Sequence, residues 1–277
     1  MNFEKEYESK KAYIEEVLKE GETLGFDGRV VSVGEGEGYA AIAGKKNAKV
    51  NYQVDLIDEI WEDRPVLSEE PAFNLDVKYA GETVASKLAR IREEMKEAGT
   101  NVHVVSTIDD ICWTLNIRGN DIDFFPLVLS YGIITMDSFE LYIDERKLDD
   151  KLKAELAKDG VNLHPYNDIY EDVKKFGSDV VAMIDPGKLN YALFNNIPEN
   201  VKTVEKRNPA ILMKAIKNPV EIENIRKAQI KDSVAHVRFM KWLKENVGKM
   251  RITEMSASDK LDELRAEMGN FIRPSFE

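Results

Sequence analysis

The stretch STIDDICWTLNIRGNDIDFFPLVLSYGIIT, residues 106–135, is the part of the sequence that says most about the fold. Its first half is typical of a short helix with apolar residues on one side. Asp109 or Asp110 is predicted to accept the free N–H groups at the start of that helix. Gly119 and Asn120 are predicted to end it by adopting positive φ. The first half therefore indicates a helix between two tight turns.

Strands are predicted on both sides of this helix. The apolar run at 102–105 is short and rich in β-branched residues, which favours a buried strand over a helix. Pro126 blocks a helix after the turn. Residues 127–135 and 139–143 are then predicted to form two strands joined by a hairpin turn at 137–138.

The rest of the central region continues an alternation of helices and strands. A Pro- and Glu-rich linker at 68–74 precedes an amphipathic helix at 80–98, which Gly99 is expected to end. Buried strands separated by helices favour an α/β domain whose helices flank a mostly central sheet. The further elements predicted are helices at 149–158, at 169–176 and from about 187, and strands at 161–164 and 180–184.

The beginning of the chain contains a glycine-rich segment that invites a nucleotide-binding interpretation. Residues 3–20 are predicted to form an amphipathic helix, and residues 24–26 and 29–33 two strands. The segment GEGEG at 34–38 follows them, but Tyr39 stands where the dinucleotide motif needs a third small residue, and no Lys-Ser/Thr ending marks a P-loop. We therefore expect a flexible loop that leads into a helix.

The end of the chain is predicted to be helical. Residues 207–217 are interpreted as a connector into the longest helix, with Asn218 as its cap and Pro219 in its first turn. Asp232 lies in the apolar stripe of that helix and is expected to bond a backbone N–H or a basic partner, since an unpaired buried carboxylate is costly. The predicted inner stripe is Ile225, Ala228, Asp232, Ala235, Phe239 and Trp242.

Composition and charge exclude several classes of function. The 277 residues are 43% apolar and 32% charged, with a net charge of −12 and no basic block, so nucleic acid and anionic membranes are not expected as partners. The longest apolar stretch, around 124–134, is shorter than the roughly 18 residues of a membrane span. Cys112 is the only cysteine, which excludes an intramolecular disulfide and fits a reducing compartment. We expect a soluble, cytoplasmic protein.

Few side chains are spaced for chemistry. His103, His164 and His236 are scattered without a zincin pattern, and a structural role is favoured over a functional one for each. The carboxylate pairs 109–110 and 121–123 would suit a cation or acid/base work, but capping and turn formation explain them more simply. Cys112 is interpreted as a small buried hydrophobe rather than a nucleophile.

A family resemblance is carried by residues 108–133. The run Asp109-Asp110-Ile111, the run from Trp113 to Asp121 with its Arg-Gly-Asn-Asp turn, Pro126 and Ser130-Tyr131 resemble the second domain of three-domain Xaa-Pro aminopeptidases, in the creatinase and prolidase superfamily. The resemblance implies mixed-sheet creatinase N-terminal-like domains with flanking helices, followed by the opening helices of an incomplete pita-bread domain. The implied domains are 1–67, the later part of domain I; 68–206, domain II; and 207–277, the linker and first helices of domain III.

Shorter segments extend the resemblance along the chain. Residues 25–29 and 55–65 are similar to the end of the first domain of this family and its exit into the second. Residues 217–232 and the helix that contains 253–260 are similar to the first two helices of its catalytic domain, and 271–276 to that domain's first catalytic-sheet strand. The resemblance therefore covers most of the chain.

The resemblance also implies an activity for the complete enzyme. That enzyme would remove an N-terminal residue preceding proline at a dinuclear Mn²⁺ or Zn²⁺ centre held by two Asp, one His and two Glu, all expected beyond residue 277. No residue of this sequence matches one of these ligands, so no catalytic or metal-binding residue is assigned, and the chain alone is expected to be inactive. Proline-containing peptides and homo-oligomers of the complete enzyme are the implied partners.

Three residues are predicted to face the substrate groove. Arg118, Asn120 and Asp121 form a polar turn after an apolar helix, and in the complete enzyme such a turn would border the groove between domains. The alternative is an arginine tied to local carboxylates that fixes the turn. For the whole chain, the alternative function is a non-catalytic peptide-binding or subunit-pairing regulatory module.

Overall fold

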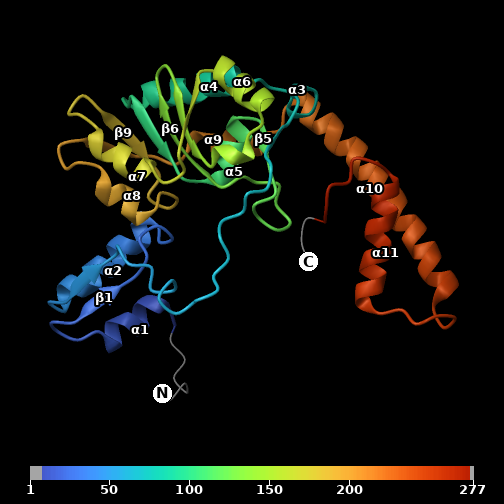
Figure 1. Ribbon diagram of the computed structural model, residues 1–277, viewed down its shortest axis with the longest axis horizontal. Helices are drawn as coiled ribbons and strands as arrows, with labels where there is room; N and C mark the ends of the chain where they lie inside the picture. Colours follow the sequence, from blue (N-terminus) through green and yellow to red (C-terminus); the bar gives the residue numbers. More distant parts are fainter. Residues whose placement is uncertain (1–7, 275–277) are drawn as a thin grey trace.

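A six-stranded mixed sheet forms the centre of the molecule in the computed structural model, which describes residues 8–274 (Figure 1). Its strand order is β10-β9-β4-β6-β7-β8; β4, β9 and β10 are mutually parallel, and β6 runs antiparallel to both of its neighbours, β4 and β7. The predicted α/β fold with a mixed sheet is confirmed. The strands are β4 Val102–Val105, β6 Ser130–Thr135, β7 Phe139–Ile143, β8 Val161–His164, β9 Val181–Ile184 and β10 Lys202–Glu205. Of these six strands, β10 was not predicted from the sequence.

Helices cover both faces of this sheet because successive strand residues point to opposite sides. Met183 belongs to one apolar core, and its neighbours Ala182 and Ile184 belong to the other. One face is covered by α4 Val84–Glu97, α5 Ile108–Thr114, α6 Asp150–Lys158 and α9 Pro209–Ala215; the other by α7 Ile169–Asp172 and α8 Tyr191–Asn196. The predicted helix at 80–98 begins later in the structure, since α4 starts at Val84, and it is followed by Gly99 with φ +68°, as predicted.

A smaller unit precedes the sheet and docks on it. It consists of α1 Lys10–Val17, β1 Thr23–Gly25, α2 Val33–Lys45 and β2 Lys49–Asn51, around the buried residues Leu18, Ile42 and Ala43. Backbone hydrogen bonds join the unit to α8: Tyr191 N–H donates to Val31 (2.8 Å), and Val33 N–H donates to the carbonyl of Leu189 (2.9 Å). The predicted strand at 29–33 is wrong, because this segment turns into α2. The predicted helix at 3–20 is shorter in the structure, and its first residues, 3–7, lie outside the described range.

The predicted glycine-rich loop at 34–38 is also wrong, since these residues form the first turns of α2. Ser32 caps the helix by accepting from the N–H of Glu35. Gly36 packs against an aromatic ring: a Cβ added there would lie 2.3 Å from Cδ2 of Tyr191. The glycine therefore allows close packing of helix on helix and does not form a phosphate-binding turn.

The turn chemistry of residues 106–121 differs from the prediction at both ends of α5. Thr107 is the N-cap residue, and Asp109 and Asp110 lie in the first turn, where the helix dipole favours acids. Asn116, with φ +52°, makes the left-handed turn instead of Gly119-Asn120. Gly119 is required for another reason, because a Cβ there would meet Cγ2 of Val128 at 2.5 Å. Residues Ile117–Arg118 form β5, which pairs with β3 Phe73–Asn74.

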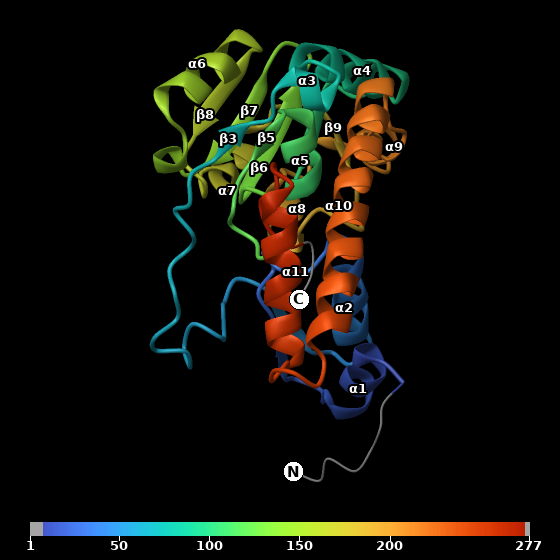
Figure 2. The ribbon, with the colours of Figure 1, turned by 90° about the vertical axis from the view of Figure 1, so that its right-hand side faces the viewer.

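A helical hairpin of α10 Pro219–Asn246 and α11 Glu254–Glu267 extends from the sheet domain (Figure 2). Asn218 caps α10 as predicted, and its Nδ2 also donates to the carbonyl of Ala80 (2.8 Å), at the end of α3 Val77–Ala80. The connector predicted at 207–217 instead contains α9. No helix within residues 8–274 is long and apolar enough to cross a membrane.

The inner stripe predicted for α10 is only partly correct. Ala235 is fully buried, whereas Ile225 and Ala228 are exposed. Asp232 has the expected basic partner, since Arg265 Nε of α11 donates to its carboxylate at 2.8 Å. Residues 271–274 contain no strand, and the remainder of the strand predicted at 271–276 lies outside the described residues.

Candidate functional site

Arg118 lies in β5 with its guanidinium turned back toward the chain. Its Nη1 donates to the carbonyl oxygens of Cys112 (2.9 Å) and Ile117 (2.8 Å). Burial lowers the pKa of the guanidinium from its usual value. The partners are a carbonyl of α5 and one of β5, not the local carboxylates considered above. These bonds fix the turn, and contact of Arg118 with a substrate stays a prediction.

Asp121 is held by a buried ion pair beneath the same turn. Its Oδ2 accepts from Lys147 Nζ (2.6 Å) and from the N–H of Leu129 (2.7 Å). The Asp121 side chain is 0% exposed and that of Lys147 2%. Lys147 ends the short 3₁₀ helix η1, Glu145–Lys147, so the pair joins the turn to the segment after β7. Nothing in the sequence marks Lys147 as buried, because it lies within a charged segment, residues 144–151.

The loop that follows Asp121 approaches the end of the described chain. Arg273 Nη1 contacts the carbonyl oxygen of Ile122 at 3.5 Å, so the segment after α11 lies against this loop. Phe124 has φ +66°, a costly conformation for a bulky residue, and Phe125 is 55% exposed. The Oδ1 atoms of Asn120 and Asp121 are buried without a hydrogen-bond partner among residues 8–274. The predicted turn therefore lies on the side of the sheet domain that meets the residues after α11.

The histidines have structural partners. The ring of His103 lies between the carbonyl of Met183 (3.1 Å) and Oδ1 of Asn208 (3.2 Å), and burial lowers its pKa. His164 Nε2 contacts Glu140 Oε2 at 2.6 Å, and His236 lies 3.5 Å from Asp232 in α10. These contacts fit the structural interpretation of all three.

The paired carboxylates at the start of α5 bind a lysine of α9. Lys214 Nζ contacts both Asp109 and Asp110, the latter at 2.8 Å. Asp110 is 2% exposed and also accepts from Nδ2 of Asn208 (2.9 Å). Cys112 is fully buried, and burial raises the pKa of its thiol to about 11, so it is a protonated hydrophobic residue rather than a nucleophile.

A polar crevice opens where the parallel strands β4 and β9 end. After β4 the chain passes to α5 on one face of the sheet, and after β9 it passes to α8 on the other. Ligands of open α/β sheets bind at such switch points, beside the carboxyl ends of the strands. The crevice has a volume of about 200 Å³ and is lined by Arg29, Val30, Val31, Ser32, Ser106, Tyr131, Lys188 and Asn190.

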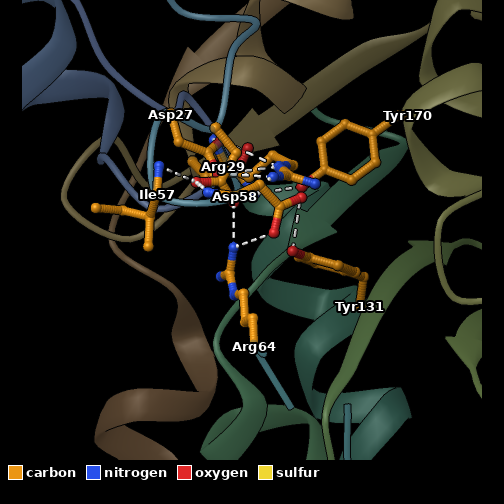
Figure 3. A network of polar contacts seen from close by, with 9 residues as sticks. Asp27, Arg29, Ile57, Asp58, Arg64, Tyr131 and Tyr170 are labelled. Atoms are coloured by element: carbon orange, nitrogen blue, oxygen red, sulfur yellow. Dashed lines mark hydrogen bonds and ion pairs between the residues drawn. The ribbon is translucent and has the colours of Figure 1, made fainter. Parts of the chain in front are cut away.

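An ion-pair network supports one wall of this crevice (Figure 3). Arg29 donates through Nε and Nη2 to Asp27 and through Nη2 to Asp55 (3.1 Å). Arg64, also labelled in Figure 3, donates through Nη1 to Oδ2 of Asp55 (2.6 Å) and to Oδ1 of Asp58 (2.9 Å). The hydrogen bond that Arg29 donates to Asp27 raises the pKa of the arginine, which keeps the guanidinium charged.

Tyrosines complete the crevice beside the network. The hydroxyls of Tyr131 and Tyr170 lie 3.1 Å apart, and Asn190 Nδ2 donates to Tyr170 at 3.2 Å. This site was not predicted from the sequence. The charged residues of two segments, 25–29 and 55–65, could have indicated the network, but these segments are distant in the sequence and come into contact only in the folded protein.

The described residues do not fit a dinuclear metal centre. Within residues 8–274, no three His, Cys, Asp or Glu side chains are grouped so as to hold a metal ion. Two of the carboxylates singled out above are engaged by lysines, Asp121 by Lys147 and Asp110 by Lys214. We therefore assign no metal ligand and derive no metal-dependent step.

Comparison with known proteins identifies the class of the chain. The family described as Creatinase/Prolidase N-terminal domain matches residues 63–221, which include the sheet domain. The chain belongs to this family. Within it, the relatives that match almost the whole chain are Xaa-Pro aminopeptidases, as the resemblance at residues 108–133 implies.

Two relatives and one crystal structure illustrate the match. A probable Xaa-Pro aminopeptidase P of Sordaria macrospora is 34% identical over 93% of this chain and 44% of its own length. Xaa-Pro aminopeptidase 1 of Dictyostelium discoideum is 34% identical over 94% of this chain and 43% of its own. The X-prolyl aminopeptidase of Caenorhabditis elegans, described as a cytosolic enzyme with a di-nuclear active site, superposes with a TM-score of 0.91 at 30% identity, over 97% of this chain and 45% of its own. The chain thus spans less than half the length of these relatives.

Proposed function

We propose that this chain forms the leading, non-catalytic part of an Xaa-Pro aminopeptidase. The complete enzyme would remove the N-terminal residue that precedes proline, at a dinuclear Mn²⁺ or Zn²⁺ centre. The observation that carries the proposal is the superposition on the C. elegans enzyme, which extends through both the sheet domain and the α10–α11 hairpin and covers 97% of this chain.

The contribution of the chain would be to shape the peptide-binding groove. Arg118, Asn120 and Asp121 are proposed to border that groove, and the contact of Arg273 with Ile122 supports this by bringing the segment after α11 to the same loop. The buried pair of Asp121 with Lys147 would hold the loop in position. We further propose that the complete enzyme is cytoplasmic and forms homo-oligomers.

The activity proposal is tested on the purified 277-residue chain. Release of the N-terminal residue from Xaa-Pro peptides is measured with added Mn²⁺ and, separately, Zn²⁺, with the C. elegans X-prolyl aminopeptidase as the positive control. We expect turnover by the control and none by the chain. Metal-dependent turnover by the chain itself would overturn the proposal.

A regulatory or subunit-pairing module is the second candidate. Apolar side chains exposed along α10 favour it, since a pairing surface would bury them; Ile230 is 66% exposed and Val237 67%. The reading frame on both sides of this sequence separates the two candidates. Continuation into a segment with two Asp, one His and two Glu would support the aminopeptidase, and a stop codon directly after Glu277 would support the module.

A further inference from the structure

We propose that the crevice at the carboxyl ends of β4 and β9 is a binding site for a small oxyanion, a carboxylate or phosphate group. Its lining contains two cationic side chains, Arg29 and Lys188, and no carboxylate. The remaining polar lining consists of hydroxyls and an amide, which donate well to oxyanions. The site requires no metal centre, so the proposal goes beyond peptide cleavage and is independent of it.

Arg29 is held in place before a ligand arrives. Asp27 and Asp55 take the hydrogen bonds of its Nε and Nη2, and Nη1 takes part in none of them. Those carboxylates are 12% and 11% exposed, whereas the arginine side chain is 50% exposed. Because Nη1 donates none of these hydrogen bonds and the side chain is half exposed, this nitrogen remains available for a ligand, and little side-chain entropy is lost on binding.

Lys188 is the second cationic side chain of the crevice, and it lies outside the ion-pair network of Arg29 and Arg64. It is exposed and forms no ion pair with any carboxylate in the described part of the chain. Its backbone is fixed, since its N–H donates to the carbonyl of Asp185 (2.9 Å) and its own carbonyl accepts from Ser106 Oγ (2.9 Å). An ammonium group without a carboxylate partner is a ready donor of charge-assisted hydrogen bonds to an anion.

Recognition depends on side chains rather than on the amino end of α2. The N–H of Val33 and that of Gly34 already donate to the carbonyls of Leu189 and Pro186, and Ser32 takes the N–H of Glu35. Since Ser32 Oγ accepts that bond, its own hydrogen can be donated to a ligand. Burial raises the pKa of Tyr131, so its hydroxyl also remains a donor.

The size of the crevice limits the ligand. Its volume is about 200 Å³. Pockets for drug-sized ligands start at about 300 Å³. The crevice therefore suits inorganic phosphate, or a molecule of amino-acid or dipeptide size that ends in a carboxylate.

The test is a titration of the purified chain at constant ionic strength with phosphate, with acetate and with glycyl-proline. Amide ¹H–¹⁵N shifts of residues 30–32 and 188–190 report binding. Saturation by phosphate alone would identify a phosphate site, and saturation by acetate and the dipeptide a carboxylate site; either result supports the proposal. Absence of a saturable shift at these amides with all three ligands would overturn it.

Variants show whether the binding is specific. Lys188→Gln should weaken binding about tenfold, the value of one charge-assisted hydrogen bond, and Lys188→Glu should abolish it. Lys202→Gln is the matched control, since Lys202 is also exposed but lies at the opposite end of the sheet, at the start of β10. Equal affinity in the Lys188→Gln variant and the control would mean non-specific screening and would refute the site.

Discussion

Replacing Lys147 by methionine should destabilise the sheet domain strongly. The substitution keeps most of the side-chain volume but leaves the Asp121 carboxylate, which is 0% exposed, without its cation. Removing one partner of a buried ion pair costs about 3–5 kcal/mol. The N–H of Leu129 still donates to the carboxylate but supplies no charge. We therefore expect the upper part of that range, a large share of the roughly 5–15 kcal/mol that stabilises a typical domain.

The assay is urea unfolding of the chain followed by circular dichroism and tryptophan fluorescence. Lys151→Met is the matched control, because Lys151 is exposed in α6 and forms no ion pair within the described residues, so its replacement should change the free energy of unfolding by no more than about 0.5 kcal/mol. The double variant Lys147→Met with Asp121→Asn should recover much of the loss. An amide oxygen still accepts from Leu129, and no buried charge remains unpaired.

Either of two results would contradict a stabilising role for the charge of Lys147. A loss below about 1 kcal/mol for Lys147→Met would mean that water reaches the carboxylate and that the pair behaves like a surface salt bridge. A double variant no more stable than Lys147→Met would mean that the lysine contributes by packing and not by charge.

Three further predictions follow from the same structure. Gly36→Ala should lower the free energy of unfolding by about 1–3 kcal/mol, because the added methyl group would meet the ring of Tyr191. Gly44→Ala, on the same helix but with no atom near the added methyl group, should raise the free energy of unfolding by roughly 0.5–1 kcal/mol. Urea unfolding of both variants compares the two effects. Burial lowers the pKa of Lys87 from 10.5 to about 8, so the folded state binds fewer protons than the unfolded state between these values. The free energy of unfolding should therefore rise with pH above about 8. Urea unfolding midpoints measured across this pH range should show the rise in the original protein and not in the Lys87→Met variant. In a full-length relative, substitution of the arginine that corresponds to Arg118 by alanine should raise KM in a peptide-cleavage assay, whereas unchanged kinetics with lower stability would assign it to the turn alone.

Apolar patterning and capping signals predicted most of the sheet domain. The run at 102–105 is β4, and Asp149 caps α6 at the predicted position. These features depend on residues close together in the sequence, where periodicity and local hydrogen bonds determine the structure. Asn218 is a further example, since its cap on α10 needs only the three residues that follow it.

Three features that the sequence did not reveal depend on contacts between distant segments. Gly36 looked like a loop glycine because Tyr191, the ring it accommodates, is more than 150 positions away in the chain. Asp121 looked like a turn residue because nothing nearby indicates that Lys147 folds over it. The crevice was missed for the same reason, since Arg29, Tyr131 and Lys188 come from three separate segments. The pattern of neighbouring residues in a sequence carries no information about such long-range contacts.

The conformation of the loop at 119–125 lowers the stability of the domain, which suggests that the loop is kept for function. The buried pair of Asp121 and Lys147 is one cost, because such pairs are often less stabilising than well-packed apolar residues of similar volume. A second is that the buried Oδ1 atoms of Asn120 and Asp121 lack partners among the described residues. A third is the left-handed conformation of Phe124. What the arrangement does provide is a fixed position for the exposed ring of Phe125, on the loop that Arg273 contacts at Ile122. Stability alone would favour an apolar anchor and a glycine at position 124. We therefore interpret the loop as a positioned surface directed toward the residues after α11, which is where the proposed aminopeptidase groove would require it.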